Sequence, residues 1–257
     1  MSEIAAVVFD YGHTLVDFRR TEEALLEAYG AIRDRIEAAL EIEAPEVGHL
    51  IDRVANEVDR RVAASYEERR LEELDIVALF DDILLSTLGL TVPPDVVRHI
   101  VALDHSAYSR TITVSADTLR VLKELKARGL RLGLISNVSL LPDLMREDLR
   151  ALGIMQHLDA ATFSSEAGTR KPDPRIFRGV LQELQVPPAR AVFVGDRLDD
   201  DIAGAKGVGM RAVLTREFRL EEPDDIRPDA LIDRLSELPE LIAHWQARQA
   251  NGDRAAR

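Results

Sequence analysis

Short apolar runs and helical patterns follow one another through much of the chain. Four runs are rich in Val, Ile and Leu and do not alternate with polar residues, at residues 4–9, 130–135, 191–194 and 211–214. Such runs are typical of parallel strands buried on both faces. Because helical patterns separate them, they predict an α/β fold with a doubly wound parallel sheet. Weaker runs at residues 160–163 and 230–233 predict two further strands.

The pattern becomes purely helical between the first predicted strand and residue 115. Helices are predicted there at residues 21–41, 45–65, 71–88 and 94–108. A segment of about a hundred residues is too long for a loop in a compact domain, so it predicts an inserted helical domain. We expect a core of residues 1–15 and 115–245, a helical domain of residues 16–114, and a disordered polar tail at residues 246–257.

Composition limits the class of protein and its partners. The chain has 257 residues, and 46% of them are hydrophobic, which is enough for a sizeable core. Its formal net charge of −13 predicts no general attraction to nucleic acid or to an anionic membrane. It contains no cysteine, hence no disulfide and no thiolate ligand. With no apolar run of membrane-spanning length and no signal-peptide pattern, we expect a cytoplasmic monomer or homodimer.

Reactive side chains follow the predicted strands. Asp10 comes directly after the first strong run, Ser136 and Asn137 after the second, and Asp196 just after the third, while Lys171 lies downstream of the weak run at residues 160–163. Open parallel sheets bind ligands outside the carboxyl ends of their strands, near the point where the strand order reverses. We therefore expect a carboxylate nucleophile, a hydroxyl donor, an ammonium group and further acids to converge there.

The order of these motifs resembles that of the haloacid dehalogenase-like hydrolase superfamily. The matching motifs are Phe9-Asp10-x-x-x-Thr14-Leu15, Ser136-Asn137, Lys171-Pro172-Asp173-Pro174 and Val194-Gly195-Asp196-x-x-x-x-Asp201-Ile202. Each motif is weak alone, but four in this order at strand ends form a specific signal. The resemblance covers nearly the whole chain and implies a Rossmann-like core, with the helical insertion similar to that superfamily's cap domain.

The resemblance implies a nucleophile and a metal site. Asp10 would attack phosphorus and form an aspartyl-phosphate, which divides the hydrolysis into two steps. The implied cofactor is Mg²⁺, a hard cation that prefers oxygen ligands. It would be held by Asp10, by Asp196 and by the main-chain carbonyl of Gly12, with Asp201 supporting it through water.

The resemblance also implies residues that hold the substrate, a small phosphorylated molecule. Phosphoryl transfer needs mainly positioning and stabilisation of charge on the transferring oxygens. Ser136 would donate a hydrogen bond to a phosphoryl oxygen, and Lys171 would neutralise both that group and the crowded carboxylates. Thr14 and Asn137 complete the implied substrate site.

Each of these residues also has an ordinary structural interpretation. Asp10 could cap a helix, Ser136 could belong to a plain turn, and the run Asp199-Asp200-Asp201 could be solvated. Because four motifs occur in order, we favour the functional interpretation and leave only Asp199 and Asp200 open. We expect the arginines of the helical insertion to be mostly solvated.

Position 12 departs from the phosphatase pattern. Most phosphatases of this superfamily carry a second Asp two residues after the nucleophile, where it acts as general acid and base, and this chain has Gly12. The spacing from Asp10 to Thr14 is kept, so the main-chain carbonyl remains and the proton shuttle is lost. General acid–base catalysis typically raises a rate by about 10²–10⁴-fold. Hydrolysis of alkyl phosphate esters, whose leaving groups need a proton, should therefore be slowed most.

Three explanations of this departure remain open. His13 has an ordinary pKa of about 6.5 and could carry the proton if its ring points inward. Alternatively, the substrate has a good leaving group, such as an acyl or aryl phosphate, or the cap supplies an acid. Or the reaction differs, because the dehalogenase and phosphonatase branches of the superfamily also lack Asp at this position.

The leading hypothesis is a Mg²⁺-dependent phosphohydrolase that acts on a small phosphorylated metabolite. The first alternative is a metal-independent 2-haloacid dehalogenase or a phosphonatase-like hydrolase that uses the same Asp10. The pair of Asp196 and Asp201 argues against a metal-free site, because close carboxylates are hard to maintain without a cation. The second alternative is a non-catalytic ligand-binding relative, which the presence of all four motifs disfavours.

Overall fold

The protein consists of two compact units in a computed structural model that describes residues 3–222 and 225–255. The first unit contains the chain up to Asp17, Thr113–Asn137 and the described chain from Leu149 onward. The second unit contains Phe18–Ile112 and Val138–Asp148.

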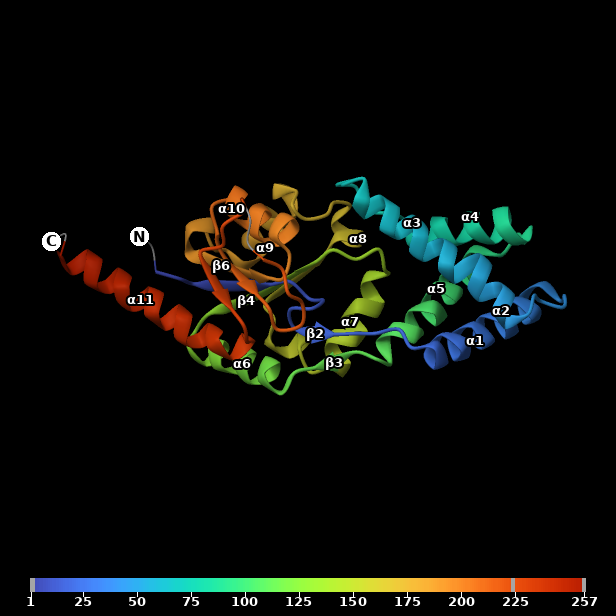
Figure 1. Ribbon diagram of the computed structural model, residues 1–257, viewed down its shortest axis with the longest axis horizontal. Coiled ribbons are helices and arrows are strands. Elements are labelled where there is room, and N and C mark those ends of the chain that lie inside the picture. Colours follow the sequence, from blue (N-terminus) through green and yellow to red (C-terminus); the bar gives the residue numbers. More distant parts are fainter. Residues whose placement is uncertain (1–2, 223–224, 256–257) are drawn as a thin grey trace. The chain divides into compact units, whose positions relative to one another are not determined.

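A six-stranded parallel sheet forms the centre of the first unit (Figure 1). The strand order is β5-β4-β1-β6-β7-β8, so the chain builds outward on one side of β1 and then on the other. All six predicted strands are present, and the predicted doubly wound α/β fold is confirmed. The strands are β1 (Ala6–Phe9), β4 (Arg131–Ser136), β5 (Ala160–Phe163), β6 (Ala191–Gly195), β7 (Arg211–Thr215) and β8 (Ala230–Ile232).

Helices cover both faces of this sheet. Helices α9 and α10 lie on one face, and α6 and α11 lie on the other (Figure 1). On the first face the rings of Phe177 and Phe193 pack edge to face with their centroids 5.2 Å apart. Burial on both faces explains why the strand sequences are continuously apolar. The helices of this unit are α6 (Ala116–Ala127), α8 (Ser164–Ala167), α9 (Pro174–Leu184), α10 (Gly204–Gly207) and α11 (Leu238–Ala255), with a π-helical turn at Leu198–Ala203 and 3₁₀ turns at Met155–His157, Pro188–Arg190 and Leu235–Glu237.

Two very short strands lie where the chain passes between the units. Strands β2 (Val16–Asp17) and β3 (Thr113–Val114) pair in antiparallel orientation. The two segments that connect the units are therefore hydrogen-bonded to each other within the first unit. A two-residue strand has too short a pattern to be predicted from sequence.

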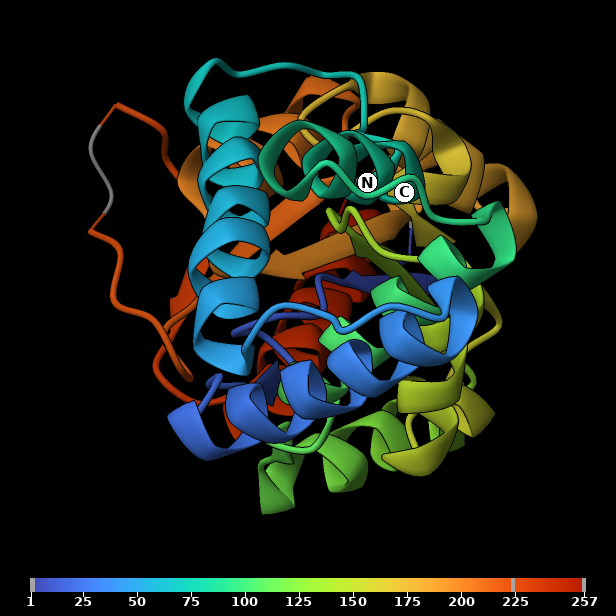
Figure 2. The same ribbon diagram turned by 90° about the vertical axis from the view of Figure 1, so that its right-hand side faces the viewer.

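The second unit is helical and surrounds its own apolar core. Buried side chains such as Ile32, Phe80 and Ile100 belong to one cluster, and α1 packs along α5 (Figures 1 and 2). The helices are α1 (Glu22–Leu40), α2 (Val47–Leu50), a π-helical turn (Ile51–Ala55), α3 (Asn56–Glu67), α4 (Ile76–Leu88) and α5 (Pro94–Ser109).

One predicted helix begins later than expected. The helix predicted from residue 71 starts at Ile76, because the Asp75 side chain accepts hydrogen bonds from the main-chain nitrogens of Val77 and Ala78 at 3.0 and 3.1 Å. A carboxylate in this position satisfies donors of the first turn that otherwise have no partner.

The segment Val138–Asp148 belongs to the second unit, although the sequence places it in the core. It contains most of α7 (Pro142–Ala151), and Leu140 and Leu141 before this helix pack against the apolar cluster of the second unit. Asp148 also pairs with His105 of α5, with 2.7 Å between its Oδ2 atom and the histidine Nε2 atom. The helical domain thus includes a segment from beyond the insertion that the sequence predicts.

The C-terminal segment differs from the expected disordered tail. Helix α11 continues to Ala255, beyond the start of the predicted tail at residue 246. The residues concerned include Ala, Arg and Gln, which favour helix.

None of the helices in the described ranges combines the length and the apolar character that crossing a membrane requires.

Candidate active site

Asp10 stands at the carboxyl end of the central strand β1. This strand is fully buried between β4 and β6, and the Asp10 main-chain nitrogen donates to the Val194 carbonyl at 2.9 Å. The chain then turns sharply, because the Leu15 nitrogen donates back to the Tyr11 carbonyl at 2.9 Å. The residue Asp10 is 7% exposed, so the sheet presents a buried carboxylate at the point where its strand order reverses.

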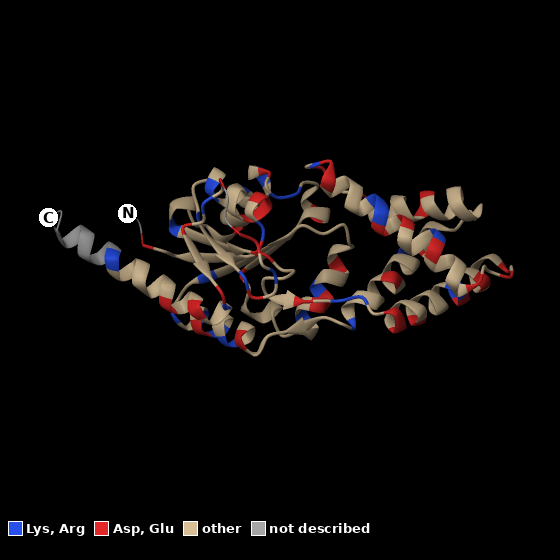
Figure 3. Ribbon diagram, viewed as in Figure 1, with Lys and Arg blue, Asp and Glu red and all other residues tan. Residues whose placement is uncertain are grey.

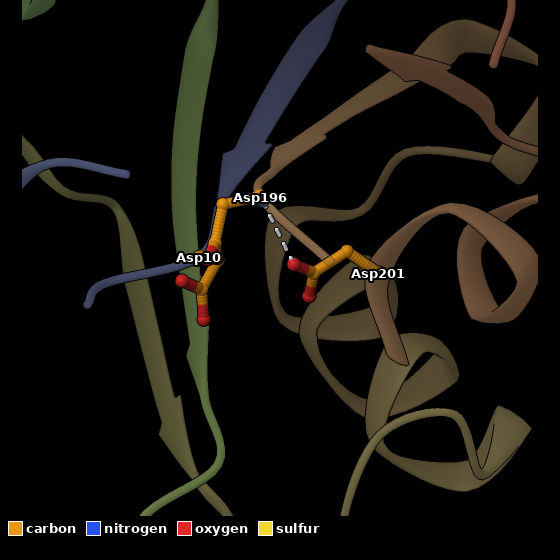
Figure 4. Close-up of side chains that lie close together, drawn as sticks. All are labelled: Asp10, Asp196 and Asp201. Atoms are coloured by element: carbon orange, nitrogen blue, oxygen red, sulfur yellow. Dashed lines mark hydrogen bonds between the residues drawn. The ribbon is translucent and has the colours of Figure 1, made fainter. Parts of the chain in front are cut away.

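Three buried carboxylates meet at this edge of the sheet. Asp10, Asp196 and Asp201 each place an oxygen atom within 4.8 Å of the others. Figure 4 shows that Asp10 and Asp196 leave the ends of neighbouring strands, while Asp201 comes from the turn that follows β6. Asp201 Oδ2 accepts hydrogen bonds from the main-chain nitrogens of Asp196 and Arg197, both at 3.0 Å. Asp201 is thereby fixed beside the other two acids.

Lys171 is the buried cation of this cluster. Its Nζ atom donates to Asp10 Oδ1 at 2.5 Å and to Asp201 Oδ1 at 2.7 Å. Burial alone would lower the pKa of Lys171, but the two carboxylates outweigh burial and raise the pKa above its usual range. The lysine therefore stays charged and neutralises part of the acid cluster.

Asn137 holds the main chain of Lys171 in place. The Asn137 side chain accepts from the Lys171 nitrogen at 2.7 Å and donates to the Lys171 carbonyl at 3.0 Å. The sequence predicts a substrate contact for Asn137. The structure shows that Asn137 also forms hydrogen bonds to the main chain of Lys171. Ser136 is the last residue of β4 and is 4% exposed, so it lies at the same edge of the sheet as Asp10.

Asp196 lacks a full set of partners. Its Oδ1 atom lies 3.5 Å from the Thr14 hydroxyl, whereas its buried Oδ2 atom accepts no hydrogen bond from any residue in the described parts of the chain. The Arg219 Nη1 atom lies 3.3 Å from Oδ2 and forms an ion pair without hydrogen-bond geometry. Burial, together with the neighbouring charges of Asp10 and Asp201, raises the pKa of Asp196. A further cation at Oδ2 would relieve both effects.

The residues at this edge fit a hard divalent cation. Mg²⁺ prefers oxygen ligands, and Asp10 and Asp196 offer carboxylate oxygens from adjacent strand ends. Both oxygens of Asp201 already accept hydrogen bonds from protein donors, so Asp201 suits a supporting role better than direct coordination.

His13 lies in a turn and is directed to Asp17. Its φ of +58° falls in the left-handed region, and its Nδ1 atom lies 3.1 Å from Asp17 Oδ1. Burial and the positive charge of Arg219 lower the pKa of His13. The structure thus places an imidazole that Asp17 orients next to Gly12.

Sequence reasoning missed two residues that shape this site. Arg219 lies in the loop after β7 and belongs to no motif, so its contact with Asp196 depends on loop conformation that no local pattern reveals. The fourth motif contains Gly195 but assigns it no role. A Cβ atom there would come within 2.3 Å of Asp201 Oδ2, so only glycine permits this approach.

Asp199 and Asp200 are less buried than the three acids of the cluster. Asp199 is exposed. Asp200 is half-buried, and this burial raises the pKa of its carboxyl group.

Arginines of the second unit pair with nearby acids on the surface, as Arg60 does with Glu57 at 2.6 Å. Figure 3 shows acidic and basic residues interspersed along its helices. This pattern is typical of a solvated helix face.

Fold and site together define an α/β enzyme with a carboxylate nucleophile candidate at the reversal of the strand order. Residues 4–209 match the model of the haloacid dehalogenase-like hydrolase family. The chain therefore belongs to this family, and it is a hydrolase.

Proteins similar to this chain include phosphatases and a dehalogenase. Glyceraldehyde 3-phosphate phosphatase of Methanopyrus kandleri is 32% identical over 93% of this chain and 97% of its own. Phosphoserine phosphatase of Thermus thermophilus is 41% identical over 46% of each chain. Among solved structures, 2-haloacid dehalogenase from Pseudomonas syringae pv. Tomato DC3000 is 29% identical, with a TM-score of 0.65 and coverage of 94% of this chain and 99% of that chain. The relatives named as phosphatases support a phosphatase.

Proposed function

We propose that this protein is a Mg²⁺-dependent phosphohydrolase that forms an aspartyl-phosphate on Asp10 and acts on a small phosphorylated metabolite. The observation that carries the proposal is the pairing of Asp10 with Lys171 beside the Asp196 Oδ2 atom, which accepts no hydrogen bond from the described residues. The relative named glyceraldehyde 3-phosphate phosphatase makes phosphorylated sugars and acids of three carbons the first substrates to test.

The reaction has two steps on Asp10. Because Lys171 holds Oδ1, we assign the attack to Oδ2, which bonds to phosphorus while the bond from phosphorus to the leaving oxygen breaks. Water then attacks phosphorus, and the carboxylate of Asp10 leaves as phosphate is released. In both steps Lys171 offsets negative charge on the phosphoryl group, and Ser136 donates a hydrogen bond to it.

The metal site would be formed by Asp10, Asp196 and the carbonyl of Gly12, with Asp201 supporting it. When bound, Mg²⁺ neutralises charge on the phosphoryl oxygens and aligns them with the attacking carboxylate. Lys171 holds Asp10 in place, and Asp201 in turn holds Lys171, because the Lys171 Nζ atom donates to both carboxylates.

Gly12 limits the proton transfers in both steps. An aryl or acyl phosphate needs no protonation of its leaving group, so its first step proceeds without the missing acid. We assign the remaining proton transfer in the second step to His13, because Asp17 orients its imidazole at 3.1 Å in the manner of a base with its orienting carboxylate. This arrangement restores only part of the rate enhancement that a carboxylate directed at the attacking water would provide.

The direct test measures phosphate release with Mg²⁺ or with EDTA. Substrates are acetyl phosphate, p-nitrophenyl phosphate, glyceraldehyde 3-phosphate and phosphoserine. We expect Mg²⁺-dependent turnover by the wild type and a loss of at least about 10³-fold in Asp10→Asn. Gly12→Asp should raise the rate on the alkyl esters by about 10²–10⁴-fold. Asp95→Asn, which changes an acid whose side chain is 82% exposed, serves as the control with unchanged rates.

A second candidate function is hydrolysis of a 2-haloacid at carbon by Asp10. The absence of Asp at position 12 and the likeness to the 2-haloacid dehalogenase structure favour it. Halide release from 2-chloropropionate in EDTA, without phosphate release from any phosphate ester, would establish this reaction instead. A protein that turns over neither class would be a ligand-binding relative.

A further inference from the structure

Arg219 is a basic residue at the acid cluster that no motif includes. It stands on the loop between β7 and β8, and its guanidinium is 3.3 Å from Asp196 Oδ2. Its side chain is 31% exposed, whereas that of Asp196 is 3% exposed. Arg219 therefore contacts an acid of the last motif directly.

The loop is fixed on both sides of Arg219. Glu217 accepts a hydrogen bond from the Leu235 nitrogen at 2.7 Å. Glu221 accepts one from the Leu198 nitrogen at 3.0 Å, and Leu198 begins the turn that carries Asp201. These hydrogen bonds fix the chain two residues before and two residues after Arg219. The position of Arg219 is therefore built into the first unit.

The contact between Arg219 and Asp196 is an incomplete one. The Asp196 Oδ2 atom accepts no hydrogen bond from the described residues, so the guanidinium balances charge without satisfying that oxygen. A divalent cation at Oδ2 would satisfy it better and would repel the guanidinium. Because Arg219 is partly exposed, its side chain can turn away from Asp196 without repacking of the core.

We propose that Arg219 is a specificity-determining residue that pairs with Asp196 until the metal displaces it and then binds an anionic oxygen of the phosphorylated substrate. Guanidinium groups match phosphate oxygens in geometry and stay charged at all relevant pH values. The chain has a net charge of −13, so an anionic substrate needs positive charge close to it. Arg219 and Lys171 together supply that charge. The proposal takes its ligand from the proposed phosphohydrolase function.

Isothermal titration calorimetry tests both parts without any turnover. Mg²⁺ is titrated into the wild type, Arg219→Ala and Arg227→Ala, and inorganic phosphate is then titrated into each Mg²⁺-loaded protein. Arg227 is an exposed arginine of the same loop and serves as the matched control. We expect Arg219→Ala to bind Mg²⁺ up to about fivefold more tightly, because a partly exposed competing ion pair is removed. It should bind phosphate about tenfold or more weakly.

Kinetics provide a second measurement if the wild type is active. Arg219→Ala should raise KM with little change in kcat, and Arg219→Lys should recover part of the affinity. Unchanged binding of both Mg²⁺ and phosphate, or weaker Mg²⁺ binding, in Arg219→Ala would overturn the proposal. A wild type that binds phosphate through Arg219 but hydrolyses no phosphate ester would refute the proposed function and leave this inference standing.

Discussion

Position 12 and its neighbours decide which chemistry this site can perform. Asp10 and Lys171 could be predicted from sequence, because their motifs occur in order at the ends of apolar runs. The direction of the His13 ring could not be predicted. An extended backbone would turn adjacent side chains to opposite sides, but His13 has a φ of +58° and pairs with Asp17. A single left-handed residue thus defeats a rule based on strand periodicity.

Asn137 offers a test of how Lys171 is held. Asn137→Ala removes both side-chain hydrogen bonds to the Lys171 main chain. A displacement of about 1 Å at a catalytic group can cost about 10²-fold, so we expect kcat/KM on p-nitrophenyl phosphate to fall by about that factor. The exposed Asn56→Ala serves as the control. Equal kcat/KM values for the two variants would show that Asn137 does not position the lysine.

Helices and strands could be predicted where burial determines the local sequence pattern. They could not be predicted where contacts between residues distant in sequence determine the structure. Parallel strands such as β1 and β6 are apolar throughout because both faces are covered. The segment Val138–Asp148 belongs to the second unit because of leucine packing and the pair formed by His105 and Asp148, which are 43 residues apart. No window of sequence contains both partners.

A half-buried acid of α5, which contacts α1, gives the stability a pH dependence. Asp104 accepts a hydrogen bond from the Tyr29 hydroxyl at 2.8 Å, and burial raises the pKa of Asp104 to about 6. The folded state holds this proton more tightly than the unfolded state, so the stability that protonation contributes is lost as pH rises through about 6. Asp104→Asn should match the wild type near pH 4 and exceed its unfolding free energy by roughly 2 kcal/mol at pH 8.

Urea denaturation of both proteins at the two pH values measures this difference. The comparison between pH values cancels any constant effect of replacing the carboxyl group with an amide. A difference in unfolding free energy that stays the same at pH 4 and pH 8 would contradict a raised pKa at Asp104.

At the scale of the whole molecule, the sheet brings together residues that are far apart in sequence. Asp10 and Lys171 are separated by 161 positions and are hydrogen-bonded at the edge of one sheet. The βαβ pattern predicts such convergence. It does not predict the loop that brings Arg219 to Asp196, because loop conformation depends on anchors such as Glu221 and Leu198.

Metal binding should stabilise the whole molecule. An ion that binds only the folded state at 100 times its dissociation constant adds about 2.7 kcal/mol to the free energy of unfolding. We expect saturating Mg²⁺ to raise the Tm of the wild type and to have little effect on Asp196→Asn. Scanning calorimetry with Mg²⁺ or EDTA measures both shifts. Equal shifts in the two proteins would place the ion elsewhere.

The central claim is that Asp10 becomes phosphorylated, and rapid-mixing kinetics with p-nitrophenyl phosphate test it most directly. Since Gly12 offers no base to the attacking water, the second step should be slow and the phosphorylated enzyme should accumulate. We predict a burst of about one p-nitrophenol per active site, a matching phosphoryl adduct on Asp10 by mass spectrometry, and loss of the burst with faster steady turnover in Gly12→Asp. Steady turnover that persists in Asp10→Asn, with no burst and no adduct in the wild type, would contradict the account.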